Sequence, residues 1–548
     1  MDRALHIFDT INLLSSPATL VLISTILLAA VGLCLTQRNT LPLPPGPPPE
    51  PILGHYRLIP DDSPFKQYAR WSKEYQSDVL FFWSLGSKWM VLNSLDAAVE
   101  LLEKRGSNYA DRPRFVMFEE FLIWIGSDQE KAMGWAPTLT WLRWGPKYHL
   151  HRRVLQPLFT GSRVGQYADL QRREALRCCM DMLDRPEDWL GAVRRFSVAV
   201  VLKIAYGLDV DGPDSPWIKM AEDTSEAVGK SGAPASSIVD RFPPARYLPD
   251  WLPFMERLRY ARTWRPAIEK LTREPFEASL KVMASEADRK SFVHTKMRTW
   301  TENQRNGLPN EFDLDDIQGA AATIVIAGND TTTATLMLLI LYLIQNPLVQ
   351  RRAQEEVDRF VGRDRLPTWS DLRNLQYVNL VLQETYRINP LSPLGVPHAS
   401  IADDVYRGMF IPRGTIVYPN VWAMCHDETV YKDPFVFRPE RYLPKEKGGD
   451  GEPLPVGSFG FGRRICVGKN LSDNSLLIVL ATLLATVDID WPLGEDGKPT
   501  PFEPEWSFRG QALVLPFKTS IRSRSAKSRA LLEKELAKIN ATTQDSGP

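Results

Sequence analysis

The sequence has no excess of charge of either sign. Among its 548 residues, lysine and arginine together number 66, and aspartate and glutamate together also number 66. Proteins that bind the phosphate backbone of nucleic acids rely on a surplus of basic residues, which this chain lacks. The composition therefore argues against a nucleic-acid partner.

Cysteine is scarce as well. The five cysteines are at positions 34, 178, 179, 425 and 466, so two are adjacent and one lies in an apolar N-terminal stretch. This pattern is not a disulfide framework and favours a reducing compartment for the bulk of the chain. Cys466 has no second cysteine or histidine within several residues, which excludes a tetrahedral zinc site built from this loop alone.

Cys466 lies in a glycine-rich loop, residues 458–468, with the sequence Ser-Phe-Gly-Phe-Gly-Arg-Arg-Ile-Cys-Val-Gly. One thiolate is sufficient as the proximal ligand of a heme iron. Gly460, Gly462 and Gly468 allow the backbone to turn tightly and to approach a flat macrocycle. Backbone N–H groups directed at the sulfur, together with Arg464, would keep the thiol ionised.

The loop resembles the Phe-x-x-Gly-x-Arg-x-Cys-x-Gly motif of the cytochrome P450 family. Phe459, Gly462, Arg464, Cys466 and Gly468 occupy the five specified positions. The resemblance implies heme b as cofactor, Cys466 as its iron ligand and the other four as cofactor-binding residues. The alternative is an inert cysteine in a glycine-rich turn, which the other motifs of the family, present in order along the chain, argue against.

The same resemblance covers roughly residues 41 to 518 and implies a mainly α fold with a small β region. Length alone predicts two or more domains, whereas the family has one large catalytic unit. We expect a catalytic domain over residues 53–518 and a polar C-terminal tail over residues 519–548. Residues 79–92 predict a β-hairpin, and the residues after Gly468 predict an apolar helix that ends near Thr486.

Residues 18–35 carry no charge and are long enough to cross a bilayer core. A cleaved signal peptide is the alternative, but no clear small-x-small cleavage site follows the stretch. Arg38 on its C-terminal side favours a cytosolic catalytic domain, and Arg3 weakens that inference. We expect residues 1–40 to be a single-pass anchor in the endoplasmic reticulum membrane and the proline-rich residues 41–52 to be a stiff hinge.

Residues 313–345 predict one long apolar helix. Its central Asn-Asp-Thr sequence argues against a membrane span, because an ionisable group in lipid is costly. A buried carboxylate flanked by hydroxyls instead indicates a functional site.

Residues 327–332 of this helix match the oxygen-activation motif of the P450 family. The resemblance implies that the small Ala327 and Gly328 leave room for dioxygen, and that Asp330 and Thr331 are catalytic residues that deliver protons. The alternative for Thr331 is a hydrogen bond to the backbone carbonyl one turn earlier in the helix.

Three more cofactor contacts are implied by the resemblance. Tyr148 and Arg152 are four residues apart and share one face of a predicted helix, where similar proteins usually carry Trp-x-x-x-Arg that reaches a heme propionate. A solvated basic face is the alternative for this cluster. His398 is implied to offer a cation to a propionate, with a satisfied structural histidine as the alternative.

Glu384 and Arg387 are three residues apart on a predicted helix, which is the right spacing for an ion pair. In the P450 family, the arginine at the position of Arg441 completes a buried Glu-Arg-Arg network. The resemblance therefore implies a structural role for these three residues and not a catalytic one.

The resemblance implies a monooxygenase that hydroxylates or otherwise oxidises a lipophilic small molecule. Residues 404–415 resemble the corresponding segment of fungal secondary-metabolite oxidases, which favours a terpenoid or another secondary metabolite as substrate. Residues 113–143, 242–249 and 507–511 resemble segments that line the substrate channel. The sequence lacks a dinucleotide motif, a phosphate loop and a flavin domain, so electrons are expected from NADPH-cytochrome P450 reductase. Two alternatives remain: an oxygen-independent isomerase or dehydratase of the same family, and a non-catalytic heme-binding membrane protein.

Overall fold

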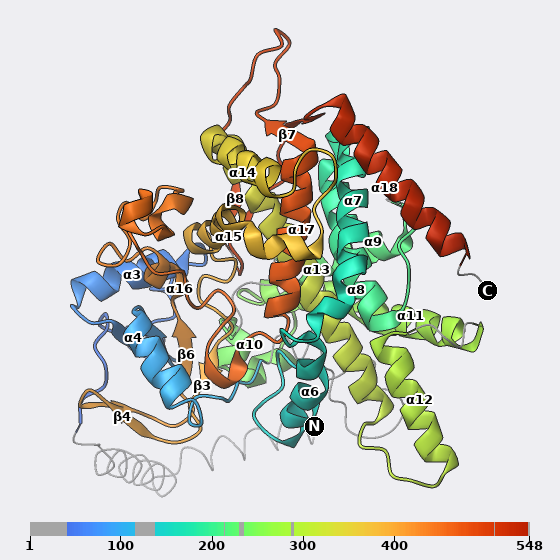
Figure 1. The fold of residues 1–548 in the computed structure, drawn as a ribbon. Coiled ribbons are helices and arrows are strands. Elements are labelled where there is room, and N and C mark those ends of the chain that lie inside the picture. Colours follow the sequence, from blue (N-terminus) through green and yellow to red (C-terminus); the bar gives the residue numbers. More distant parts are fainter. Residues whose placement is uncertain are drawn as a thin grey trace, which may run out of the picture. The chain divides into compact units, whose positions relative to one another are not determined.

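The computed structural model describes residues 41–115, 138–212, 214–229, 235–285, 290–508 and 510–545 (Figure 1). The expected membrane anchor at residues 1–40 and most of the expected substrate loop at residues 113–143 lie outside the described residues. The site geometry therefore rests on the remainder of the chain.

The chain divides into two compact units. The described part of the smaller unit consists of residues 41–44 and 403–413. In it, β4 (Asp404–Tyr406) and β5 (Met409–Ile411) form an antiparallel hairpin, and the Phe410 N–H donates to the Pro42 carbonyl over 2.8 Å. The larger unit, residues 45–402 and 414–548, contains every residue predicted for the functional site.

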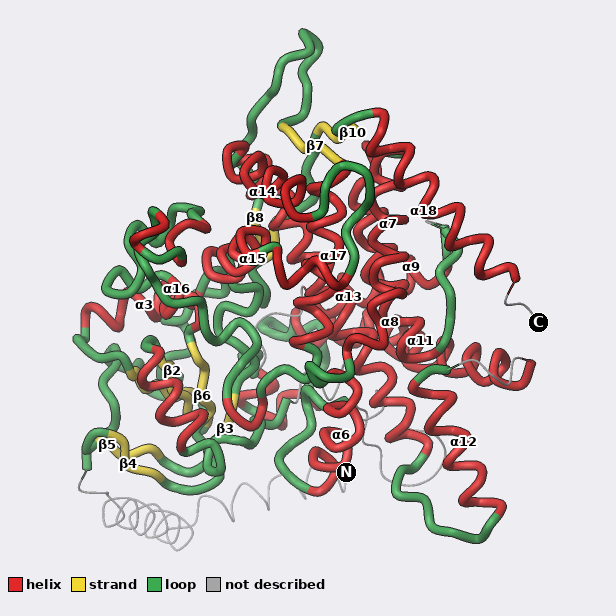
Figure 2. The backbone as a smooth tube through the Cα atoms, in the orientation of Figure 1, coloured by secondary structure: helices red, strands yellow, loops and turns green. Residues whose placement is uncertain are grey.

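The larger unit is mainly helical, as predicted (Figure 2). Its helices are α3 (Pro64–Glu74), α4 (Leu95–Ala98), α6 (Pro146–Leu155), α7 (Ala168–Asp184), α8 (Trp189–Tyr206), α9 (Pro216–Gly229), α10 (Ile238–Arg241), α11 (Glu256–Ser285), α12 (Phe292–Arg305), α13 (Leu314–Gln345), α14 (Pro347–Phe360), α15 (Gln376–Ile388), α16 (Val421–Cys425), α17 (Lys469–Thr486) and α18 (Ala526–Asp545).

Helix α13 is the central helix of this unit and packs most extensively against α8 (Figure 1). It begins where the Asp313 carboxylate accepts the Asp316 N–H over 2.6 Å, and it ends two residues before Pro347, which has no N–H to continue the ladder. Within the described residues, α13 alone is long and apolar enough to cross a membrane. Most of its apolar window is buried inside the unit, as expected of a core helix.

A four-stranded sheet, with the order β1-β2-β6-β3, places His398 next to the core. Strands β1 (Val79–Ser84) and β2 (Ser87–Leu92) form the predicted hairpin, β6 (Ile416–Pro419) runs parallel to β2, and β3 (His398–Ala399) runs antiparallel to β6. In the last pair, His398 lies opposite Val417. The sheet thereby fixes the backbone of His398.

Two further strand pairs complete the unit. Strand β7 (Val487–Asp490) pairs antiparallel with β10 (Ser520–Ser523), and β8 (Trp506–Ser507) pairs antiparallel with β9 (Leu513–Val514). Each pair joins segments that follow α17, so the C-terminal part of the chain folds back onto itself.

The segment expected to be a polar tail contributes β10 and α18 to the larger unit. Leu532 of α18 is fully buried, and Glu535 pairs with Arg172 of α7 over 3.0 Å. Leu532, Leu536 and Ile539 recur at helical spacing and pack on the core, a stripe that the high charge of the segment conceals.

Candidate active site

The cysteine loop joins a short 3-10 turn (Gly462–Arg464) to the start of α17. The Cys466 N–H donates to the Phe459 carbonyl over 2.8 Å and closes the loop. Gly462 has a φ of +52°, and a Cβ there would lie 2.1 Å from the Leu102 carbonyl oxygen. Glycine at 462 is therefore required by the chain behind the loop, a reason that the motif alone does not reveal.

Four neighbouring groups act on the pKa of the Cys466 thiol. Removal of the thiol from bulk water and the charge of Asp473 raise this pKa, the backbone N–H groups of Gly468 and Lys469 and the charge of Arg152 lower it, and the net result is a raised pKa. Two N–H groups directed at the sulfur agree with the sequence-based expectation. The cation near the thiol, however, is Arg152 and not Arg464, because Arg464 is turned toward Ala110 and Tyr148.

Arg464 is a buried cation whose terminal groups are unpaired. Its Nε donates to the Ala110 carbonyl over 2.6 Å, and its guanidinium lies 3.8 Å from the centroid of the Tyr148 ring. Nη1 and Nη2 are buried without a hydrogen-bond partner in the described part of the chain. Burial lowers the pKa of Arg464 to about 10. A buried guanidinium with two unused donors is costly unless an anion binds it.

Arg112 is a second buried cation beside Arg464, and the sequence did not reveal it. Its Nη1 donates to the carbonyls of Val396 and Pro397 over 2.7 and 2.8 Å. Burial and the charge of Arg464 lower its pKa to about 9. Arg112 therefore fixes the backbone directly before His398 and adds positive potential to the same place.

Tyr148 and Arg152 lie on α6, as predicted, and both bind the backbone of the cysteine loop. The Tyr148 hydroxyl donates to the Arg463 carbonyl over 2.6 Å, and Arg152 Nη1 donates to the Ile465 carbonyl over 2.7 Å. The sequence interpretation assigned both side chains to a heme propionate. In the structure they support the loop from the side of α6.

His398 is a neutral histidine in this structure. Its Nδ1 lies 2.8 Å from the Tyr109 carbonyl and therefore carries the hydrogen, which leaves Nε2 as an acceptor. Burial and the charge of Arg112 lower its pKa to about 3. With no anion beside it His398 is neutral, so the buried positive charge at this place comes from Arg112 and Arg464, and the expected contact of His398 with a propionate stays a prediction.

In the middle of α13, the carboxyl group of Asp330 and the hydroxyl group of Thr331 lie on neighbouring faces of the helix. Ala327 is exposed although the helix is otherwise mostly buried, and Thr331 one turn later shares its face. The Thr331 hydroxyl donates to the Ala327 carbonyl over 2.7 Å, so the alternative considered for this threonine is present. Ala327 and Thr331 thus line one accessible strip of a buried helix.

Asp330 faces the neighbouring helix α9. Its Oδ1 is hydrogen-bonded to the Ser225 hydroxyl and accepts from Asn329 Nδ2 over 2.9 Å. Burial raises its pKa to about 6, against the opposing effects of Ser225 and Asn329. A carboxyl group with such a pKa exchanges protons near neutral pH.

Gly328 serves helix packing in this structure. A Cβ on Gly328 would lie 2.5 Å from Cγ1 of Val201 on α8, well inside the van der Waals distance of carbon atoms. From the sequence we expected the small size of Gly328 to leave room for dioxygen. The structure shows instead that its missing side chain lets α13 approach α8.

The residues predicted to form a buried ionic network are brought together. Glu384 accepts two hydrogen bonds of 2.9 Å from Arg387 and one of 3.0 Å from Arg441, and all three side chains are fully buried. The Tyr442 hydroxyl donates to Glu384 over 2.7 Å, and Glu452 binds Arg441 over 2.7 Å. The network ties α15 to the segment that precedes the cysteine loop.

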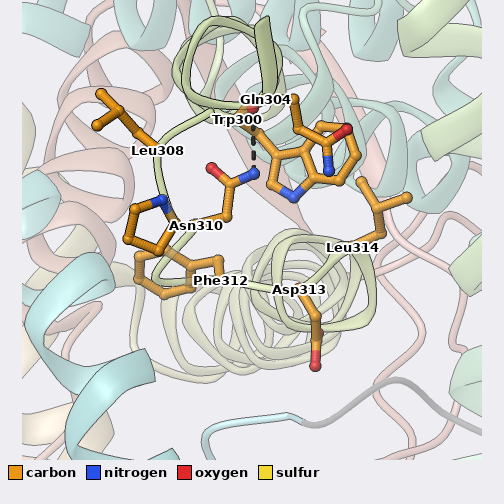
Figure 3. Close-up of a pocket in the computed structure, with 8 residues that line it drawn as sticks. Trp300, Gln304, Leu308, Asn310, Phe312, Asp313 and Leu314 are labelled. Carbon is orange, nitrogen blue, oxygen red and sulfur yellow. Dashed lines mark hydrogen bonds between the residues drawn. The ribbon is translucent and has the colours of Figure 1, made fainter. Parts of the chain in front are cut away.

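A surface cleft of about 580 Å³ lies between α12 and α13 (Figure 3). Trp300 and Phe312 present their rings to it, and Asn310 Nδ2 donates to the Trp300 carbonyl over 3.2 Å. Leu314, which lines the cleft at the start of α13, precedes Thr331 by seventeen positions, which is roughly 25 Å along a helix. The cleft is therefore separate from the site around Cys466.

Comparison with known proteins identifies the family. The profile of the family described as Cytochrome P450 matches residues 44–516. The chain belongs to the cytochrome P450 family. The matched range includes Cys466 with its loop, the α13 motif and the Glu384 network.

Several fungal P450 enzymes are similar over most of their length. A cytochrome P450 monooxygenase from Coprinopsis cinerea is 32% identical over 95% of this chain and 100% of its own. Tryptamine 4-monooxygenase from Psilocybe cyanescens is 32% identical over 83% of this chain and 88% of its own. A P450 monooxygenase from Armillaria gallica is 32% identical over 84% and 88%. This fungal-type P450 is therefore a monooxygenase, an oxidoreductase, with heme b as cofactor.

The residues of this P450 fit heme b. The unpaired N–H groups of Arg464, beside the second cation Arg112, provide donors and charge for the carboxylates of the heme. Cys466 provides a single thiolate with two N–H groups directed at it. Ala327 and Thr331 leave an accessible strip on the otherwise buried α13.

Proposed function

We propose that this P450 oxidises a lipophilic small molecule of fungal secondary metabolism, with terpenoids as the first class to test. The proposal is supported by similarity to fungal P450 monooxygenases over nearly the whole chain. One relative of comparable identity acts, by its name, on tryptamine. Because similarity at this level spans more than one substrate, tryptamine belongs in the same screen as a competing class.

The cofactor-binding roles follow from the site chemistry. Cys466 is the iron ligand, and the bound heme supplies the activation of dioxygen. Arg464 binds a heme propionate, since its two terminal nitrogens are buried and unpaired. Phe459, Gly462 and Gly468 shape the loop around the thiolate.

Three further residues complete the cofactor site. Tyr148 and Arg152 hold the loop through its carbonyls, and the charge of Arg152 also favours the thiolate. His398 lies beside Arg112, and a propionate placed next to its Nε2 would favour the protonated form.

Asp330 and Thr331 are proposed to deliver protons to the distal side. The pKa of Asp330, raised to about 6, suits a group that takes a proton from solvent and passes it to the Thr331 hydroxyl. The Thr331 hydroxyl donates to the Ala327 carbonyl when dioxygen is absent, and bound dioxygen would compete with that carbonyl as the hydrogen-bond acceptor. Glu384, Arg387 and Arg441 have a structural role, because they are fully buried and bonded to one another.

We further propose that residues 1–40 anchor the enzyme in the endoplasmic reticulum membrane by a single span, with the catalytic domain in the cytosol and NADPH-cytochrome P450 reductase as electron donor. An apolar patch supports membrane contact by the larger unit. In this patch Tyr247, Trp251 and Phe254 are 78%, 71% and 66% exposed, which suits the membrane interface.

The combination of the thiolate loop with the acid and alcohol of α13 carries the proposal. It is tested first by the difference spectrum of the reduced protein with and without carbon monoxide, using Cys466→Ser as the control. A strongly red-shifted Soret band in the wild type only is expected. A band typical of histidine-ligated heme in the wild type would contradict ligation by Cys466.

The second experiment measures turnover. Purified enzyme, reductase and NADPH are incubated with terpenoid candidates and with tryptamine, with and without dioxygen. We expect oxygenated terpenoid products that need both NADPH and dioxygen. Tryptamine oxidation alone would reassign the substrate class, and product formation without dioxygen would favour an isomerase or dehydratase.

A further inference from the structure

The contact between Asp330 of α13 and Ser225 of α9 joins residues that are 105 positions apart in sequence. Asp330 Oδ1 is bonded to Ser225 Oγ and accepts from Asn329 Nδ2 over 2.9 Å. Ser225 Oγ also lies 2.9 Å from the Ala221 carbonyl, one turn earlier on α9. The serine hydroxyl therefore stands between a carboxyl group and a backbone acceptor.

A hydroxyl has one hydrogen and two acceptor lone pairs, so it can donate to only one of these two oxygens at a time. When Asp330 is ionised, the Ser225 hydrogen points to the carboxylate. When Asp330 is protonated, the carboxyl O–H donates to Ser225 Oγ and the Ser225 hydrogen turns to the Ala221 carbonyl. Both protonation states are satisfied by rotation of one hydroxyl, without movement of a heavy atom.

We propose that Ser225 is the positioning residue of the proton-delivery acid, serving Asp330 in both of its protonation states so that the carboxyl group can take up and release a proton in place. The inference rests on the proton-delivery role proposed above for Asp330. Ser225 forms no covalent bond and keeps its own hydrogen throughout, because the proton that is gained or lost stays on the Asp330 carboxyl group and Ser225 only accepts or donates a hydrogen bond.

The charged groups around the contact define its solvent side. Arg194 of α8 is the charged residue that acts on Asp330 in the described part of the chain, and it favours the ionised form. Arg194 pairs with Glu222 of α9 over 2.6 Å, and each of the two is about one third exposed. Glu222 and Ser225 are three residues apart and share a face of α9, so protons from solvent reach the contact along this side.

The test compares Ser225→Val with Ser225→Thr in the heme-loaded, full-length enzyme. The two substituted side chains have nearly the same shape, and only threonine keeps the hydroxyl. The titration of Asp330 is followed by the infrared C=O stretch of its protonated carboxyl, assigned by its loss in Asp330→Asn. Peroxide release and product formation per NADPH are measured on the same samples.

Ser225→Val loses a hydrogen bond in both protonation states, but the bond to the ionised form is the stronger one, so the Asp330 midpoint should move to higher pH by about 1 unit. We also expect a larger fraction of the NADPH electrons to appear as peroxide. Ser225→Thr should keep both values near those of the wild type. Unchanged values in Ser225→Val, or equal shifts in both variants, would overturn the inference.

Failure of the underlying proposal looks different. If Asp330→Asn retained wild-type coupling between NADPH and product, Asp330 would not be the proton donor, and the role of Ser225 would be overturned with it. If Asp330→Asn lost coupling while Ser225→Val retained it, only the role of Ser225 would be wrong.

Discussion

Replacing Gly328 by alanine adds one methyl group at the closest approach of α13 to α8. The new Cβ would lie 2.5 Å from Cγ1 of Val201, about 1 Å inside normal carbon contact. Val201 is 3% exposed and β-branched, so its side chain has little freedom to turn away. One of the two helices must therefore shift, or the valine must leave its preferred rotamer.

The expected cost follows from two opposing terms. Overpacking of a well-packed core costs about 1–3 kcal/mol. Alanine is better than glycine in a helix interior by about 1 kcal/mol, which offsets part of that cost. We expect Gly328→Ala to lower the free energy of unfolding by up to about 2 kcal/mol, after both terms are combined.

A double-mutant cycle isolates the contact. Val201→Ala removes Cγ1, the methyl group that the new Cβ would meet, at its own cost of about 1–3 kcal/mol. In that background, Gly328→Ala should become neutral or stabilising, with a coupling energy of about 1–3 kcal/mol between the two sites. Unfolding by denaturant, followed by tryptophan fluorescence, measures each corner of the cycle.

The rate of carbon monoxide binding to the reduced heme separates packing from access to the iron. If Gly328 serves packing, this rate in the double variant equals that of Val201→Ala alone. The reasoning would be refuted if Gly328→Ala slowed carbon monoxide binding equally in both backgrounds and destabilised both equally. That result would restore the interpretation in which Gly328 leaves room for dioxygen.

Three further predictions concern buried charge. Glu384→Gln leaves Arg387 without its anion and should lower the free energy of unfolding by about 3–5 kcal/mol, measured with denaturant. As a control, Asp188 forms an exposed pair with Arg185 over 3.7 Å, so Asp188→Asn should change the free energy of unfolding by less than about 1 kcal/mol. The raised pKa of Asp330 makes its ionisation costly in the folded wild type, which therefore loses stability as pH rises from 4 to 7. Asp330→Asn lacks this group, so its free energy of unfolding should rise relative to that of the wild type by about 2–3 kcal/mol over this range. A difference that does not change with pH would contradict this reasoning. Arg464→Met should lose heme to a scavenging globin about 10- to 100-fold faster, with equal rates arguing against a propionate contact.

The sequence predicted those parts of the fold that local pattern determines. The helix expected over residues 313–345 occupies 314–345, because an aspartate cap and a following proline mark its ends. Glu384 and Arg387 were expected to pair because their spacing on one helix brings them together. Arg441 joined them only through the family resemblance, since it is 57 positions from Glu384.

Contacts between distant segments could not be predicted from spacing. The packing of Gly328 against Val201 could not be predicted, because Val201 lies 127 positions earlier on α8 and no local pattern links the two residues. Ser225 gave no signal for a similar reason, since serine in a helix is common and its partner Asp330 lies on another element. Arg112 lies in a short polar sequence that reads as a loop, and only burial beside Arg464 gives it a role.

The charges around the cofactor site link heme binding to folding. Arg112 and Arg464 are both nearly fully buried and repel each other, and neutral His398 offers them no negative charge. The terminal nitrogens of Arg464 remain unpaired in the described protein. The Asp111 carboxylate acts on both arginines but does not bond these nitrogens, so heme propionates bound there would stabilise this region through charge as well as through the proposed Cys466 bond. A Cys466→Ser protein should consequently still be stabilised by added heme, less than the wild type but more than a variant that also carries Arg464→Met.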